Sequence, residues 1–277
     1  MRFATGLLAL ALLGASSVLA LAQDFEPVSV PFEGGTITIT ENDELEKIVA
    51  FDGKELARNY VAFFDRTVDL GDTKVALLSV GDGGNQCGAA TLIVWKPKDA
   101  DIRSQMVGED CGSPPAAVTE SSIYFVPYLV PGASAPVETW SPETGLKVSG
   151  LLQFSPQPGT TWDEIDASKF DNLVEAFGNE ALYADAKKLL GDDLTGFATG
   201  LLTGGGTEQL PGGLFYASGC VPHACGLQDS FMAVDKKGRK LYFAQQADSG
   251  EPRTWPALAE WPGEVAKAMQ GAIGGQQ

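Results

Sequence analysis

Short runs of β-forming residues, each closed by turn residues, fill the sequence from Val28 to about Leu152. The clearest run is Thr-Ile-Thr-Ile-Thr at residues 36–40, where apolar and polar residues alternate with the period of a half-buried strand. Glycine- and proline-rich segments between the runs are typical of turns. The N-terminal half is therefore predicted to be β-rich. Its further strands are expected at Lys74 to Val80, Ala90 to Trp95, Ser122 to Leu129 and Leu146 to Phe154.

The pattern changes near residues 155–159, Ser-Pro-Gln-Pro-Gly, where we place a domain boundary. Thr161 followed by Glu164 is a capping-box signature, and it predicts a helix that continues as far as Phe177. Asn179 can cap a second helix that ends at Gly191, and a shorter third helix is expected after it. Three more strands then follow, so the whole chain is predicted to be α+β. These strands are Leu214 to Ser218, Ser230 to Val234 and Leu241 to Gln245, the third helix is at 194–202, and the two domains are at 24–157 and 160–277.

The first 22 residues have the composition of a secretory signal peptide. Arg2 precedes an apolar run from Leu7 to Leu21, and small residues at its end fit cleavage after Ala22. This run is shorter than the roughly 20 apolar residues that a membrane-spanning helix needs, and no other run of about 18 apolar residues occurs. The sequence therefore predicts an exported, soluble protein that is periplasmic or secreted.

The composition is strongly acidic, with 19 basic and 36 acidic residues and a formal net charge of −17. A charge of this sign repels nucleic acid and anionic lipid, so the sequence argues against both as partners. It attracts cationic proteins at rates that fall as the salt concentration rises. A simpler explanation, which remains open, is that the acidic surface only keeps an exported protein soluble.

Four cysteines are present, and in an exported chain an even number indicates disulfides. Four cysteines allow three pairings. Their positions favour Cys87 with Cys111 and Cys220 with Cys225, because each pair then lies within one predicted domain. A zinc site is not indicated, since Cys-x-x-Cys is absent and His223 is the only histidine. No cofactor is predicted.

The segment Cys220-Val221-Pro222-His223-Ala224-Cys225 lies between two of the predicted C-terminal strands. If its cysteines pair, the disulfide closes a small ring in which proline fixes one φ angle, so the segment becomes a stiff protrusion with the histidine at its tip. A strand connection stapled for stability, with a histidine that is merely exposed, is the alternative. Nucleophilic catalysis is not indicated, because the sequence has no Gly-x-Ser-x-Gly motif and no thiol that would stay free.

The sequence around this segment resembles a known family. Phe-Tyr-Ala-Ser-Gly-Cys-Val-Pro-His-Ala-Cys-Gly at 215–226, with Phe-Met-Ala-Val at 231–234 and Leu-Tyr-Phe-Ala at 241–244, is similar to the Ivy family, the inhibitors of vertebrate lysozyme. The family's hallmark is a protruding Cys-Lys-Pro-His-Asp-Cys loop between strands of an antiparallel sheet backed by helices. The resemblance covers roughly residues 163–250. It implies this Ivy-like architecture for the C-terminal domain and a function that is not enzymatic.

In that family the disulfide-closed loop enters the lysozyme cleft, and its histidine contacts the two catalytic carboxylates. The resemblance implies, position by position, that Cys220 and Cys225 form the clasp, that Pro222 shapes it and that His223 is the inhibitory residue. The implied partner is a lysozyme, most plausibly a cationic c-type enzyme, or an endogenous muramidase. Family members can dimerise, which leaves a homodimer open.

Two loop positions depart from the family pattern. Val221 stands where the family usually has lysine, and Ala224 stands where it usually has aspartate. The loss of these polar groups puts the strength of inhibition and the choice of lysozyme in doubt. The alternative function is a cell-envelope module that binds glycan or protein without inhibiting it, and a secreted hydrolase is a third. For residues 24–157 the sequence predicts no function.

Overall fold

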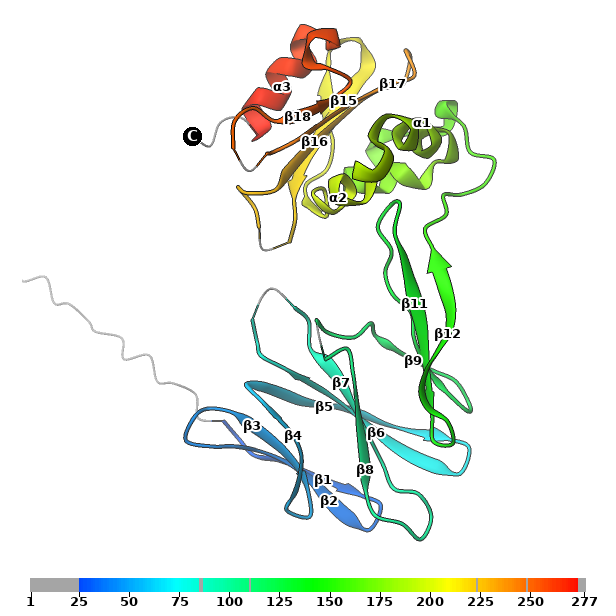
Figure 1. Cartoon of the computed structure of the whole chain (residues 1–277), viewed down its shortest axis with the longest axis vertical. Helices are drawn as coiled ribbons and strands as arrows, with labels where there is room; N and C mark the ends of the chain where they lie inside the picture. Colours follow the sequence, from blue (N-terminus) through cyan, green and yellow to red (C-terminus); the bar gives the residue numbers. More distant parts are fainter. Residues whose placement is uncertain (1–24, 85–86, 110, 223, 248, 274–277) are drawn as a thin grey trace, which may run out of the picture.

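The computed structural model describes residues 25–84, 87–109, 111–222, 224–247 and 249–273. Among these residues, three antiparallel sheets precede a fourth antiparallel sheet that is flanked by helices (Figure 1). The predicted α+β class, with its β-rich N-terminal half, is therefore confirmed. Within the described ranges no helix has both the length and the apolar composition that a membrane crossing requires. The predicted signal peptide, residues 1–22, lies outside the described residues.

The first two sheets are four-stranded meanders, in which each strand pairs with the next along the chain. Their apolar faces pack together in one core that includes Ile37, Val49 and Leu78. The alternation at 36–40 explains the first of these faces, because both isoleucines of that run are fully buried. The first sheet contains β1 (Val28–Phe32), β2 (Gly35–Glu41), β3 (Lys47–Phe51) and β4 (Lys54–Asn59). The second contains β5 (Val61–Leu70), β6 (Thr73–Gly81), β7 (Ala90–Trp95) and β8 (Arg103–Val107).

The third sheet packs on the second through large aromatic side chains. Trp140 is fully buried, its ring centroid lies 4.9 Å from that of Trp95, and its indole N–H donates to Gln105 Oε1 at 2.9 Å. The strand expected at Ser122 to Leu129 was predicted too long. It stops at Phe125 because Pro127 has no N–H for a strand ladder. The sheet has the order β12-β11-β10-β9, with β9 at Ala116–Val118, β10 at Ile123–Phe125, β11 at Ser134–Ser141 and β12 at Gly145–Gln153.

The hairpin formed by β11 and β12 connects the N-terminal sheets to the C-terminal part (Figure 1). Its far end is held against that part. Phe154 directly follows β12, and its ring lies 5.2 Å from the ring of Tyr183. Near the start of β11, a Cβ added at Gly132 would lie only 2.7 Å from Thr195 Oγ1. Both chain segments at the far end of the hairpin therefore pack against helices of the C-terminal part.

The prediction of one continuous helix from Thr161 to Phe177 is wrong, because this stretch forms three separate 3-10 turns. The capping box is present, with Thr161 N–H donating to Glu164 at 2.8 Å, but the chain leaves the helical region directly afterwards. Asp166 and Asn172 then accept hydrogen bonds from backbone N–H groups two residues ahead, and each such bond starts a new turn in place of a continuous helix. The turns are η1 (Trp162–Glu164), η2 (Ala167–Lys169) and η3 (Leu173–Gly178).

The next two helices were predicted, although the second ends at Thr199 and not at Leu202, and a later helix was missed. Asn179 caps α1 (Glu180–Leu190) by accepting from Leu182 N–H at 3.0 Å, and Gly191 ends it with a φ of +55°. Helix α2 (Leu194–Thr199) follows after one 3-10 turn, η4 (Gly191–Asp193). Helix α3 (Gly263–Ile273), near the C-terminus, was not predicted.

The fourth sheet lies between these helices, with α1 and α2 on one face and α3 on the other (Figure 1). Alternate residues of its central strand explain the two layers, because Met232 packs with α1 and α2 whereas Phe231 packs with α3. The strand order is β13-β15-β16-β17-β18, and β14 also pairs with β15. The bounds are β13 (Thr203–Gly204), β14 (Glu208–Leu210), β15 (Leu214–Cys220), β16 (Asp229–Asp235), β17 (Lys240–Gln245) and β18 (Arg253–Trp255). One short 3-10 turn, η5 (Pro211–Gly213), lies between β14 and β15, and another, η6 (Leu258–Glu260), lies between β18 and α3.

The chain that follows α2 passes close to Gly219 of β15, and this close approach leads to a stability prediction. A Cβ at Gly219 would lie 2.9 Å from the backbone of Leu201. We expect Gly219→Ala to lower the free energy of unfolding by about 1–3 kcal/mol, because backbone must move to admit the methyl group. Gly205→Ala is the control, since a Cβ there meets nothing within 4 Å. Equal urea midpoints for the two variants would contradict this contact.

Candidate functional site

The cysteine-flanked segment connects β15 to β16 and extends beyond the end of the sheet (Figure 1). Cys220 is the last residue of β15, Asp229 is the first residue of β16, and the two are paired in register. The eight residues between them, 221–228, are called the β15–β16 loop below. Paired strands on either side fix both ends of the loop, so its orientation is set by the sheet.

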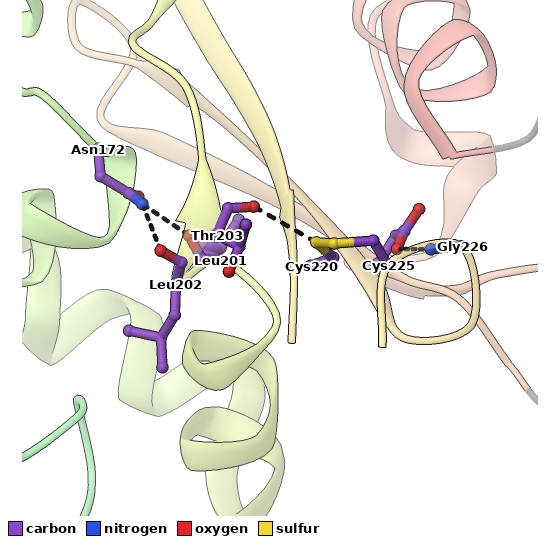
Figure 2. The surroundings of a disulfide bond; sticks show 8 residues. Asn172, Leu201, Leu202, Thr203, Cys220, Cys225 and Gly226 are labelled. Atoms are coloured by element: carbon purple, nitrogen blue, oxygen red, sulfur yellow. Dashed lines mark hydrogen bonds between the residues drawn. A yellow bond between two sulfur atoms is a disulfide. The ribbon is translucent and has the colours of Figure 1, made fainter. Parts of the chain in front are cut away.

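A disulfide joins Cys220 to Cys225 across the base of the loop, as predicted, with the two Cα atoms 4.9 Å apart (Figure 2). Cys220 is buried and its sulfur lies 3.5 Å from the carbonyl oxygen of Thr203, whereas Cys225 is exposed. The disulfide therefore fastens an exposed part of the loop to a buried position in the sheet. Asn172 supports the neighbouring chain by donating to the carbonyl oxygens of Leu201 and Leu202, as Figure 2 shows.

Backbone hydrogen bonds within the loop add a second constraint. Val221 N–H donates to Gln228 O at 3.2 Å, and Ala224 N–H donates to Val221 O at 2.9 Å. The carbonyl oxygen of Ala224 accepts from both Leu227 and Gln228, each at 3.1 Å. The loop backbone thus satisfies its own polar groups in a compact turn, as a defined conformation requires.

Side chains from the sheet hold the loop where it returns to β16. Gly226 has a φ of +86°, which suits glycine, and its N–H donates to the carboxylate of Asp229 at 2.7 Å. Gln246, just after β17, donates to Gly226 O at 3.1 Å. A hydrogen bond to a carboxylate is stronger than one between neutral groups. Asp229 and Gln246 were not predicted as site residues, because only the folded sheet brings them to the loop.

The described surface of the loop is uncharged, and apart from Gln228 it is largely apolar. Pro222 is exposed, Val221 and Ala224 are half-buried, and Leu227 has 72% of its surface exposed. His223 lies outside the described residues. Leu227 was also missed by the sequence analysis, where its only signal was an aliphatic residue just after the cysteine-flanked segment.

A hollow of about 290 Å³ lies beside the disulfide on the side of α3. The disulfide cysteines, Asp229 and Ile273 are among the residues that line it. It is small and open, and its lining has neither a paired acid and base nor a set of metal ligands. Among the described residues, no group of three or more His, Cys, Asp or Glu side chains is arranged to hold a metal ion.

The second disulfide joins Cys87 to Cys111 in the N-terminal part, as predicted, with the Cα atoms 4.7 Å apart. The two cysteines line an open cavity of about 330 Å³ together with Arg58, Asp82 and Glu109. Cys87 precedes β7 and Cys111 follows β8, so the bond ties the ends of two paired strands. Its position indicates a structural role.

Hydrogen bonds lower the pKa of three carboxyl groups in the described part of the chain. Glu55 accepts from Arg58, Glu164 accepts from Thr161, and Asp166 accepts from Ser168. The general acid of a glycosidase needs a raised pKa so that it can hold a proton near neutral pH. These three groups are shifted in the opposite direction.

Comparison with known proteins finds a family match for each part of the chain. Residues 181–275 match the family model described as inhibitor of vertebrate lysozyme (Ivy), a range that includes the whole β15–β16 loop. Residues 33–153 match the family model of the Y4bG N-terminal domain. The chain is also 27% identical over 263 residues, 95% of each protein, to the one named "Uncharacterized protein y4bG" from Sinorhizobium fredii (strain NBRC 101917 / NGR234). The Ivy resemblance inferred from the loop is therefore confirmed for the C-terminal part.

Proposed function

We propose that this protein is an exported inhibitor of lysozyme and that it acts by inserting the β15–β16 loop into the enzyme's catalytic cleft. The observation that carries the proposal is a disulfide-closed, hydrogen-bonded loop at the end of a sheet, within the region that matches the Ivy family model. The proposed organisation is a β-rich domain at 24–157 followed by the inhibitor domain at 160–277. The proposed location is the periplasm or the exterior, reached after cleavage behind Ala22.

The chemistry of the target explains why a histidine suits this role. Glycoside hydrolysis of this type uses a carboxylic acid and a carboxylate on either side of the scissile bond. An imidazole can donate a hydrogen bond to one of them and, depending on its protonation, accept from or donate to the other. We propose that His223 occupies both carboxyl groups in this way and excludes the substrate.

The rigidity of the loop supports tight binding. An element that is ordered before contact loses less conformational entropy when it docks, so more of its contact energy appears as affinity. Here the disulfide, the bonds from the Ala224 carbonyl oxygen and the Asp229 carboxylate restrict the loop from three directions. The net charge of −17 further supports a cationic partner, because it would speed the encounter at low salt.

The test of the function is an inhibition assay with the full mature chain. The purified protein should slow the lysis of a peptidoglycan substrate by a c-type lysozyme, and its association rate should fall as salt is raised. The assay should include a muramidase from the producing cell, since its cleft offers similar carboxylates. Binding to lysozyme or glycan without any slowing of lysis would favour the envelope binding module instead. Release of sugar by the protein alone would favour a hydrolase.

The two disulfides are expected to differ in their importance for inhibition. Replacing Cys220 and Cys225 with serine removes the clasp that restricts the loop, so we expect at least a tenfold weaker inhibition constant. Replacing Cys87 and Cys111 with serine is the matched control. That variant should lose about 3 kcal/mol of stability, because its bond closes the longer segment, yet it should inhibit normally at a temperature where it remains folded. Equal loss of inhibition in both variants would argue against the loop.

A further inference from the structure

Leu227 combines an exposed side chain with a hydrogen-bonded backbone. Its side chain is 72% exposed, which makes it one of the most exposed large apolar residues in the described part of the chain. Its backbone is nevertheless fixed, because its N–H donates to Ala224 O and the next N–H donates to the same oxygen. Single exposed leucines are common on protein surfaces, so exposure alone indicates nothing. Leu227 lies two residues beyond the disulfide, in a segment that hydrogen bonds order, so its side chain is presented without the cost of ordering the backbone.

The structure around Leu227 explains how it is presented. Gly226, with its positive φ, turns the chain immediately before it, and that turn is held by Asp229 on one side and Gln246 on the other. Both of these hydrogen bonds are made to the backbone of Gly226, and they leave the leucine side chain uncovered. They therefore fix the position of an apolar side chain that packs against little of its own protein.

The loop also lacks charge where the family usually has it. Between Cys220 and Asp229 the sequence has no lysine, arginine, aspartate or glutamate. The half-buried Val221 and Ala224 stand at the usual lysine and aspartate positions, so they cannot supply the ion pairs those residues would make. Apart from the disulfide, the exposed side chains in the described part of the loop are Pro222, Leu227 and Gln228; all three are uncharged, and the first two are apolar.

We propose that Leu227 is the specificity-determining contact of the loop and that it is buried against an apolar, sugar-binding subsite at the rim of the lysozyme cleft. This inference rests on the proposed function. Ligand-binding clefts are lined mainly by apolar and aromatic side chains, with a few polar groups that fix orientation, so such a surface is available next to the catalytic carboxyls. In this assignment His223 addresses the carboxyl pair, and Leu227 replaces the affinity that a charged loop would provide.

The experiment compares Leu227→Ser with Leu151→Ser in the full mature chain. Leu151, on β12 far from the loop in sequence, is a matched control because 64% of its surface is exposed. Binding to c-type lysozyme is measured by surface plasmon resonance, together with inhibition of lysis. We expect Leu227→Ser to raise Kd about 10- to 100-fold, the value for full burial of one leucine, mostly through faster dissociation. Leu151→Ser should leave Kd unchanged within about twofold.

Two further readouts separate apolar burial from other roles. Leu227→Met keeps the apolar volume and should retain nearly wild-type affinity, whereas a loss equal to that of the serine variant would overturn the proposal. The ratio of variant to wild-type Kd should stay constant as salt rises, because an apolar contact is not screened. If the wild type inhibits lysozyme and Leu227→Ser inhibits equally well, the contact is wrong and the inhibitor function stands. If the wild type does not bind any lysozyme tested, both fall together.

Discussion

Replacing His223 with alanine is expected to weaken lysozyme inhibition by about a hundredfold or more. A hydrogen bond to a charged group contributes about 1.5–3 kcal/mol, and the proposed imidazole makes two of them to a carboxyl pair. Removing the ring also leaves those carboxyl groups free to bind substrate. The measurement is the inhibition constant for lysis of a peptidoglycan substrate, determined with the full mature chain.

Two variants make this result interpretable. Gln228→Ala removes a neighbouring exposed side chain from the same loop and should inhibit like the wild type. His223→Gln keeps one donor and one acceptor, so its inhibition should lie between those of the wild type and the alanine variant. Full inhibition by His223→Ala would mean that the imidazole does not engage the carboxyl pair. The function could then survive, but through other contacts of the loop.

Trp140→Ala is expected to lower the free energy of unfolding by about 3–5 kcal/mol, the range for removing a buried aromatic side chain. The substitution opens a cavity between the second and third sheets and removes the edge-to-face contact with Trp95. It also takes away the partner of the Gln105 side chain. Chemical denaturation followed by circular dichroism measures the change. Trp140→Phe should cost less, because a phenyl ring still fills part of the space, although the hydrogen bond to Gln105 and some of the indole volume are lost.

The control for this prediction is an exposed aromatic residue of the same region. Tyr128 is 78% exposed, so Tyr128→Ala should change stability by no more than about 0.5 kcal/mol. A similarly large loss there would mean that aromatic content, and not burial between the sheets, determines the effect. Little change in Trp140→Ala would mean that the two sheets do not share a tightly packed core.

Elements whose pattern was local could be predicted from the sequence. The alternation at 36–40 gave β2, and the cap at Asn179 with a stop at Gly191 gave α1 with its ends correct. For β2 and α1, neighbouring residues alone favour the observed structure, so no distant contact was needed to decide it. The pairing of the cysteines followed from the domain boundary, because each pair lies within one predicted domain.

The errors arose where several local signals compete or where distant packing decides. Between Thr161 and Phe177 the apolar residues have helical spacing. The side chains of Asp166 and Asn172, however, each accept a hydrogen bond from a backbone N–H, and these bonds divide the stretch into 3-10 turns. Helix α3 carried a signal that the sequence analysis did not use, since its buried residues Val265 and Met269 are four apart and face one side of a helix.

The disulfide and the family-like segment of the site could be predicted from the sequence, but the side chains that the loop exposes could not. The two cysteines and the family-like segment between them were recognisable in sequence. The exposure of Leu227 was not, because it depends on the hydrogen bonds that Asp229 and Gln246 make to the backbone of Gly226. A sequence pattern cannot report which side of a turn will remain uncovered.

The hairpin of β11 and β12 has a consequence for how the loop is displayed. Its base belongs to the third sheet, and its far end is wedged against the helices through Phe154 and Gly132. Any rotation of the two parts against each other would have to break the contact between Phe154 and Tyr183, so this contact opposes such a motion. At about 3.3 Å per residue, the nine residues of β12 span about 30 Å. The strand therefore spaces the third sheet from the helices that carry the inhibitor-like sheet by about that length.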